Sequence, residues 1–231
     1  MKDFYSIAID GPSGAGKSTM ARKLAADFGF IYVDTGAIYR TVGLAAYRAG
    51  IDRHDEPAVK ALLPKLTIEM RYNEAGEQRM FLDGEDVSEA IRMPEISICA
   101  SDVAALPSVR AFLMELQRRM ARENSVIMDG RDIGTVVLPD AEVKIFLTAS
   151  AEARARRRLL ELEQKGMKRS FDEVLRDIKY RDEQDSHRAA APLKKAEDAI
   201  AVDTSELNFD ESLELVVKII RQKLGIGAED K

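Results

Sequence analysis

Five short apolar segments recur along the chain, and a polar residue follows each of them. The segments cover residues 6–9, 31–33, 125–128, 143–147 and 199–202, and the polar residues are Asp10, Asp34, Asp129, Thr148 and Asp203. Short apolar runs of this kind are typical of strands buried on both faces. Because they alternate with helical patterns, they predict an α/β fold in which helices flank a five-stranded parallel sheet.

Helical periodicity fills most of the space between these strands. Met20, Leu24 and Phe28 recur every four residues after the first strand, and another helix follows the second strand to residue 46. Further helices are predicted from residue 107, over residues 151–164 and 171–186, and near the C-terminus, where Gly225 is a cap. The helix from residue 107 is expected to bury one side with Phe112, Leu113, Leu116 and Met120.

The pattern changes between about residues 50 and 107. Residues 66–70 alternate between apolar and polar with period two, residues 73–78 supply a turn, and residues 80–82 are apolar again. This pattern predicts a small antiparallel hairpin inserted into the α/β chain.

Composition and charge narrow the classes of protein. The 231 residues include 35 Lys or Arg and 40 Asp or Glu, and the net charge of -5 argues against a dedicated nucleic-acid binder. No apolar stretch approaches the length of a membrane span, and the first ten residues lack the pattern of a secretory signal. The single cysteine forbids an internal disulfide. We therefore expect a cytoplasmic protein without a membrane or nucleic-acid partner.

A glycine-rich segment follows the first predicted strand. Residues 11–18 read Gly-Pro-Ser-Gly-Ala-Gly-Lys-Ser and fit the pattern Gly-x-x-x-x-Gly-Lys-Ser/Thr at every fixed position. Glycines let consecutive backbone N–H groups surround phosphate oxygens at a helix N-terminus. Lys17 would place a charge between the terminal phosphates of a nucleoside triphosphate, and Ser18 could ligate Mg²⁺. The structural alternative is a glycine-rich turn capped by Ser18.

Two strand-end carboxylates are further candidates for a metal site. Asp129 and Asp34 each follow an apolar run, and either could hold Mg²⁺ or its water. The carboxyl ends of parallel strands form the binding crevice of such sheets, which favours this role. The alternative for each is a helix cap at the end of a strand.

Arginines and carboxylates recur together in two other segments. Residues 130–135 read Gly-Arg-Asp-Ile-Gly-Thr, and Arg181, Asp185 and Arg188 are spaced to share one helical face. The alternatives are a local ion pair between Arg131 and Asp132 and a solvated helical face with an ion pair.

Taken together, these motifs resemble those of the bacterial cytidylate kinases, a family of nucleoside monophosphate kinases. The resemblance covers nearly the whole chain and rests on residues 11–17, 34–40, 83–87, 129–135 and 188–193. It implies phosphoryl transfer from ATP to CMP or dCMP with Mg²⁺, by a chain that is expected to be monomeric. It also implies a P-loop core of residues 1–49, 108–150 and 171–231, a monophosphate-binding insertion of residues 50–107 and a lid of residues 151–170.

The resemblance also implies roles for individual residues. Thr35, Arg110 and Asp132 would address cytosine, Ser101, Arg181 and Asp185 the sugar, and Arg40, Arg131 and Arg188 the acceptor phosphate. ATP would be bound by Gly11, Pro12, Ser13, Gly14, Ala15, Gly16, Lys17, Ser18 and Thr19, together with the lid residues Arg154, Arg157 and Arg158. The catalytic charges would come from Lys17, Arg131 and Arg188, and the Mg²⁺ ligands from Ser18, Asp34 and Asp129, directly or through water. Four near-consecutive arginines, Arg154 and residues 156–158, cover every side of a helix, so at least one is expected to face solvent.

The sequence leaves two alternatives open and disfavours a third. The chain could be a P-loop kinase for another small acceptor, such as UMP, AMP or shikimate. It could instead be a nucleotide-dependent switch that uses its arginines to bind an acidic protein partner. An RNA-binding protein is disfavoured, because the chain is acidic and aromatic residues are missing near the Arg154–Arg158 run.

Overall fold

The computed structural model describes residues 4–164 and 166–226, and these divide into two compact units. The first unit comprises Met1–Ile31 and Asn124–Lys231, and the second comprises Tyr32–Glu123. We describe each unit by itself.

The central sheet has the strand order β2-β6-β1-β7-β8. Its strands are β1 (Ser6–Asp10), β2 (Ile31–Asp34), β6 (Val126–Gly130), β7 (Val143–Thr148) and β8 (Ile200–Asp203). β1 pairs in parallel with β6 on one side and with β7 on the other, and β7 pairs in parallel with β8. The predicted five-stranded parallel sheet is therefore confirmed. Every residue of β6 and nearly every residue of β1 is buried, as expected for central strands covered on both faces.

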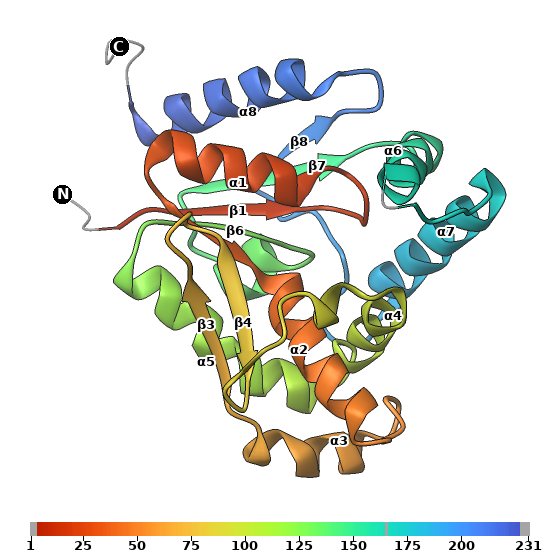
Figure 1. Cartoon of the computed structure of the whole chain (residues 1–231). Helices are drawn as coiled ribbons and strands as arrows, with labels where there is room; N and C mark the ends of the chain where they lie inside the picture. Colours follow the sequence, from red (N-terminus) through yellow and green to blue (C-terminus); the bar gives the residue numbers. More distant parts are fainter. Residues whose placement is uncertain (1–3, 165, 227–231) are drawn as a thin grey trace. The chain divides into compact units, whose positions relative to one another are not determined.

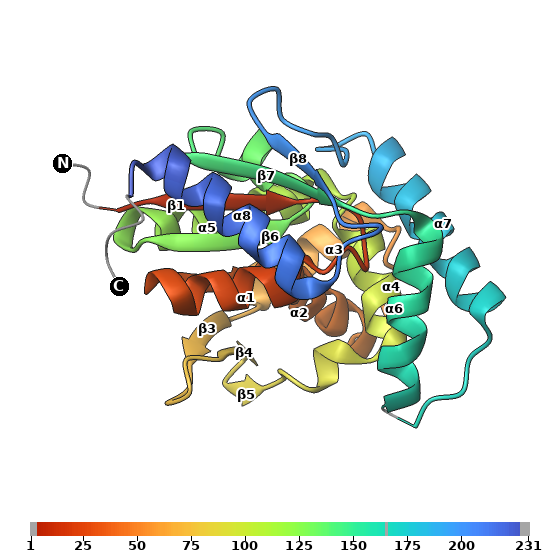
Figure 2. The same ribbon diagram turned by 90° about the horizontal axis from the view of Figure 1, so that it is seen from above.

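Four α-helices and one π-helix accompany these strands in the described part of the first unit. They are α1 (Lys17–Phe28), the π-helix η3 (Ile133–Val137), α6 (Ala151–Gln164), α7 (Phe171–His187) and α8 (Phe209–Leu224). Helices α1 and α8 lie side by side along the sheet, whereas α6 and α7 pack against each other near the carboxyl ends of the strands (Figures 1 and 2). Ala155, Leu162, Val174 and Ile178 form the apolar contact between α6 and α7.

The second unit combines helices with a small antiparallel sheet. Its helices are α2 (Thr35–Arg48), α3 (Glu56–Leu62), η1 (Leu63–Lys65), η2 (Ala90–Arg92), α4 (Pro94–Val103) and α5 (Pro107–Glu123). The sheet consists of β3 (Ile68–Tyr72), β4 (Gln78–Leu82) and β5 (Glu85–Asp86), in that order. The predicted hairpin is confirmed, and β5 adds a strand that the sequence pattern did not indicate.

Close packing of α2 against α4 depends on one glycine. A Cβ atom added to Gly43 of α2 would lie 2.9 Å from the backbone nitrogen of Ala100 in α4. Because this neighbour is backbone and cannot rotate away, only glycine fits at this crossing.

The buried face predicted for α5 is wrong at one position. Phe112 is 38% exposed, while Val109, Leu113 and Gln117 are buried, together with Arg110. The buried side of α5 includes two polar residues, Arg110 and Gln117. A prediction from hydrophobicity alone therefore placed Phe112 on the buried side in their stead.

Candidate nucleotide site

The glycine-rich segment forms a tight loop between β1 and α1. Gly11 has a φ of +150°, and a Cβ atom there would lie 1.9 Å from the carbonyl oxygen of Leu147. Gly16 precedes α1 in a left-handed conformation, and no side chain caps the N-terminus of that helix. Ser18 therefore does not serve as the cap that the structural alternative required. The N–H groups of the first helical turn are left to bind an anion.

Lys17 is buried at the base of this loop. Its Nζ donates a hydrogen bond to the carbonyl oxygen of Pro12 at 2.8 Å. Burial, and then the nearby charge of Arg131, lower the pKa of Lys17 to about 7, although Asp129, Asp185 and Asp10 oppose this shift. A polyphosphate beside Lys17 would supply the negative charge that favours the protonated amine.

Ser18 and Asp129 meet at the carboxyl end of β6. The Ser18 hydroxyl donates to Oδ2 of Asp129 at 2.9 Å. A hydroxyl and a carboxylate are the oxygen donors that Mg²⁺ accepts, and Mg²⁺ usually completes its coordination with water and substrate phosphates. The described residues contain no group of three or more His, Cys, Asp or Glu side chains that could hold a metal without such help. The pair therefore fits a nucleotide-associated Mg²⁺.

Asp34, the other candidate Mg²⁺ ligand, makes its contacts within the second unit. Its Oδ1 accepts from the backbone N–H of Ala37 and its Oδ2 from Arg40, both at 2.8 Å. Burial would raise the pKa of Asp34, but Arg40 and the N–H of Ala37 outweigh burial and lower it. The capping alternative is thus confirmed for Asp34, and its role toward Mg²⁺ stays a prediction.

Two ion pairs connect the segment after β6 to the end of α7. Arg131 Nε lies 2.6 Å from Oδ2 of Asp185, and Arg188 Nη2 lies 3.1 Å from Oδ1 of Asp132. The carboxylates of both pairs are buried. The alternative of a local ion pair between Arg131 and Asp132 is therefore wrong, because each residue pairs with a different partner. The alternative of a solvated helical face is wrong for Asp185, because its carboxylate is buried. α7 ends at His187, so Arg188 reaches Asp132 from the residue after the helix, not from the shared helical face that was predicted.

Asp10 also holds the segment after β6. Its two carboxylate oxygens accept from the backbone N–H groups of Ile133 at 2.8 Å and Gly134 at 2.7 Å. Burial raises the pKa of Asp10 to about 6, against the lowering effect of these two hydrogen bonds. The sequence marked Asp10 only as a strand end. Its role in holding the residues after Asp132 depends on a contact across 124 positions, which no local signal could show.

The arginines of α6 have different surroundings. Arg154 is buried, donates to the carbonyl oxygen of Ser13 in the glycine-rich loop at 3.0 Å and forms an ion pair with Asp182 at 2.6 Å. Arg157 donates to Thr204, and Arg158 pairs with Glu161 on the surface. Residue 156 is exposed, which confirms that at least one of the four arginines faces solvent.

The remaining candidates lie in the second unit. Thr35 and Arg110 are buried, and Ser101 is half-buried on α4. Arg110 donates to the carbonyl oxygen of Ala104 at 3.3 Å, and its guanidinium lies 5.7 Å from the centre of the Tyr39 ring. Arg181, the last candidate, is half-buried on α7 in the first unit.

Comparisons with known proteins identify the family to which the chain belongs. The family model described as cytidylate kinase matches residues 7–222. The chain belongs to the cytidylate kinase family. The cytidylate kinase of Lactobacillus gasseri is 52% identical and covers 94% of each chain, and that of Pelotomaculum thermopropionicum is 49% identical over the full length of both. An uncharacterized protein from Eubacterium ventriosum, solved by crystallography, is 15% identical with a TM-score of 0.50 over 94% of this chain and 98% of its own, and shares the fold.

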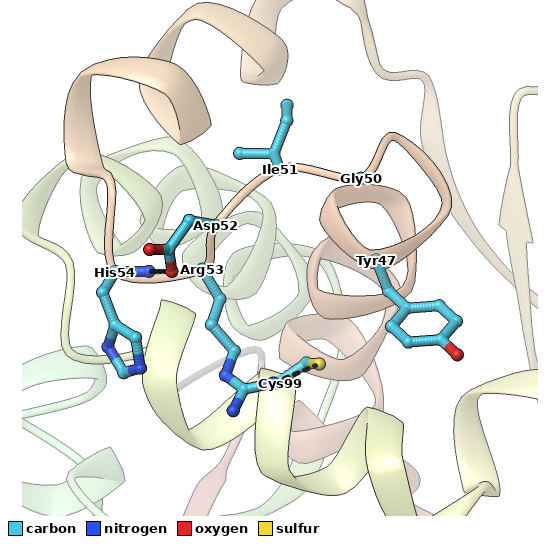
Figure 3. Close-up of a pocket in the computed structure, with 7 residues that line it drawn as sticks. All are labelled: Tyr47, Gly50, Ile51, Asp52, Arg53, His54 and Cys99. Carbon is cyan, nitrogen blue, oxygen red and sulfur yellow. Dashed lines mark hydrogen bonds between the residues drawn. The ribbon is translucent and has the colours of Figure 1, made fainter.

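The second unit also contains a pocket. This pocket of about 300 Å³ is lined by Tyr47, Gly50, Ile51, Asp52, Arg53, His54 and Cys99 (Figure 3). None of these residues belongs to the predicted site. Arg53, which points into it, already forms an ion pair with Asp102 at 2.6 Å.

Among the described residues, no single helix is long and apolar enough to cross a membrane. Glu95–Val103 and Pro107–Glu123 together reach the length and apolar composition of a span, but they form a pair bent by 96°.

Proposed function

We propose that this cytidylate kinase family member transfers the γ-phosphoryl group of ATP to CMP or dCMP and forms ADP and CDP or dCDP. The observation that carries the proposal is the concentration of buried charge beside the glycine-rich loop. Lys17, the Ser18–Asp129 pair and Arg131 lie at or just after the carboxyl ends of the neighbouring strands β1 and β6. Asp185 on α7 forms the ion pair with Arg131. The carboxyl ends of the strands are where α/β sheets bind phosphorylated ligands.

The chemistry requires positioning and positive charge more than proton transfer. The acceptor phosphate is already an anion, so no general base is assigned. Lys17 would bind the terminal phosphates of ATP, and Arg131 and Arg188 would hold the acceptor phosphate and stabilise charge on the transferring group. Mg²⁺, when bound through Ser18 and Asp129, would neutralise charge on the phosphates of ATP.

The lid and the acceptor-binding insertion are part of the proposal. Residues 151–170 would act as a lid, and the contact of Arg154 with the glycine-rich loop supports a role for α6 near ATP. Closure would exclude water from the transferring group. Residues 50–107 would form the monophosphate-binding insertion. Cytoplasmic location and a monomeric state complete the proposal.

Cytosine recognition provides the sharpest test of the acceptor. Asp132 would accept a hydrogen bond from the exocyclic amino group, and Arg110 would donate to the ring acceptors. Thr35 would assist them with its hydroxyl group. Uracil presents a carbonyl where cytosine has the amino group, and sites built around such pairs discriminate by roughly 10⁴.

The Asp132→Asn variant tests this role. We expect its kcat/KM ratio of CMP to UMP to fall by at least about tenfold, because the amide can donate to the uracil carbonyl. Asp198→Asn is a matched control, since Asp198 pairs with Lys144 on the surface of the same unit. An unchanged CMP/UMP ratio in Asp132→Asn would count against the assignment.

The switch hypothesis is not favoured, and a binding experiment separates it from the kinase. Titration calorimetry with CMP in the presence of a non-hydrolysable ATP analogue should show one CMP site per chain. Absence of CMP binding under these conditions would exclude the kinase proposal.

A further inference from the structure

The outer edge of β2 is covered by two side chains from the small antiparallel sheet. β2 is the last strand of the central sheet, so the backbone groups on its outer edge have no neighbouring strand. Alternate residues of a strand direct their N–H and C=O groups to the same edge. Ile31 donates to the carbonyl oxygen of Ser125, which assigns Tyr32 and Asp34 to the opposite edge.

Gln78 satisfies both backbone groups of Asp34. The N–H of Asp34 donates to Oε1 of Gln78 at 2.8 Å, and Nε2 of Gln78 donates to the carbonyl oxygen of Asp34 at 3.2 Å. One carboxamide thus replaces the donor and the acceptor that a neighbouring strand would supply. Gln78 is half-buried at the start of β4, where an unmade hydrogen bond has a substantial cost.

Tyr72 makes the corresponding contact two residues earlier. It lies directly opposite Gln78 in the β3–β4 ladder, and its hydroxyl donates to the carbonyl oxygen of Tyr32 at 2.8 Å. Tyr72 and Gln78 therefore bind the backbone groups of Tyr32 and Asp34, which both face the outer edge of β2. Only Gln78 contacts Asp34.

Asp34 is the residue on which the proposed acceptor-binding turn depends. It caps α2 and pairs with Arg40, and Thr35 follows it directly. A shift of the Asp34 backbone would move the cap, the threonine hydroxyl and the anchor of the Arg40 guanidinium together. Binding sites lose affinity steeply when their groups are displaced by fractions of an ångström.

We propose that Gln78 is a positioning residue for the acceptor nucleotide and acts by fixing the Asp34 backbone, and through it Thr35 and Arg40. This inference rests on the proposed function of those two residues toward CMP. Gln78 itself does not contact the acceptor.

Three variants separate this role from a merely structural one. Gln78→Glu keeps an acceptor for the Asp34 N–H, but the ionised carboxylate cannot donate to the Asp34 carbonyl. Gln78→Met keeps the length of the side chain and removes both hydrogen bonds. Tyr72→Phe is the matched control, because it removes a hydrogen bond to the same edge without touching Asp34.

We compare the KM for CMP of each variant with that of the unchanged chain at the same pH. The ratio of the two KM values does not depend on the titration of CMP itself. We expect Gln78→Glu and Gln78→Met to raise this ratio about tenfold at pH 8. KM for ATP and kcat should stay within about twofold. Tyr72→Phe should lower the urea midpoint and leave KM for CMP unchanged.

The possible outcomes distinguish a positioning role of Gln78 from a structural one. If Gln78→Met and Tyr72→Phe both reduce stability and neither changes KM for CMP, Gln78 has only a structural role and the inference is wrong. Gln78→Met provides this test even if Gln78→Glu does not fold. If the unchanged chain does not phosphorylate CMP, the proposed function fails and the inference with it. If the unchanged chain is active and the Gln78 variants match it, the inference alone fails.

Discussion

The ion pair between Arg131 and Asp185 allows a quantitative prediction. Asp185→Asn preserves the shape of the side chain and removes its charge, leaving the Arg131 guanidinium without its partner. The Asp185 side chain is 8% exposed and that of Arg131 is 21% exposed. Removing one partner of a fully buried pair costs about 3–5 kcal/mol. Because Arg131 keeps some contact with solvent, we expect a loss of about 2–3 kcal/mol in the free energy of unfolding.

The sign of the pH dependence follows from the pKa of Asp185. Burial would raise this pKa, but Arg131, and then Arg188 and Arg181, outweigh burial and lower it. The stability that the carboxylate contributes is therefore present above the ordinary pKa of aspartate, about 3.9, and is lost as the pH falls through the lower folded-state value. The difference between Asp185→Asn and the unchanged chain should be complete at pH 7 and should shrink below about pH 4.

Urea unfolding followed by far-UV circular dichroism measures this difference, since the chain has no tryptophan. The matched control is Asp177→Asn on the same helix. Asp177 is 62% exposed and pairs with Arg169 at 3.0 Å, so its replacement should cost less than about 1 kcal/mol. Equal effects of the two substitutions at pH 7 would refute the reasoning.

Three further predictions concern other parts of the chain. Burial raises the pKa of Asp10 to about 6, so ionisation of this carboxyl should lower the free energy of unfolding by up to about 3 kcal/mol as the pH rises from 4 to 7. The urea midpoint of Asp10→Asn should not show this decline, and identical pH profiles of the variant and the unchanged chain would contradict the prediction. Gly43→Ala should destabilise the protein by about 1–2 kcal/mol despite its better helix propensity, because its Cβ meets the backbone of Ala100; equal or higher stability in thermal unfolding would contradict it. Arg154→Met should raise KM for ATP while KM for CMP stays within about twofold, and the reverse pattern would exclude a role of Arg154 toward ATP.

The strands of the central sheet were predictable because their chemistry is local. Each of the five combines an apolar run with a polar residue at its end, and the structure differs from the predicted bounds by one or two residues. β5 has two residues, Glu85 and Asp86, and both are exposed, so no apolar signal marks it. The π-helix after Asp132 was not predicted either, because its start is held by Asp10, more than a hundred positions away.

The candidate site was predictable only in part, for a similar physical reason. A motif records which residue types lie near one another in sequence, so residues 11–18 indicated a phosphate loop. A motif does not show which of these residues pair with each other in the folded chain. The pairing of Asp185 with Arg131 and the engagement of Asp34 by its own helix cap appear only when the chain is folded. Gln78 carries no motif at all, and its contacts with Asp34 depend on the register of β4.

The central claim is that this chain phosphorylates CMP and dCMP with ATP. A coupled assay of ADP release, with CMP, dCMP, UMP and AMP as acceptors at equal concentrations and with Mg²⁺ present, tests it most directly. We predict rapid ADP release with CMP and dCMP, much slower release with UMP and AMP, and loss of the activity in Lys17→Met. ADP release that is equal for all four acceptors, or independent of any acceptor, would contradict the account.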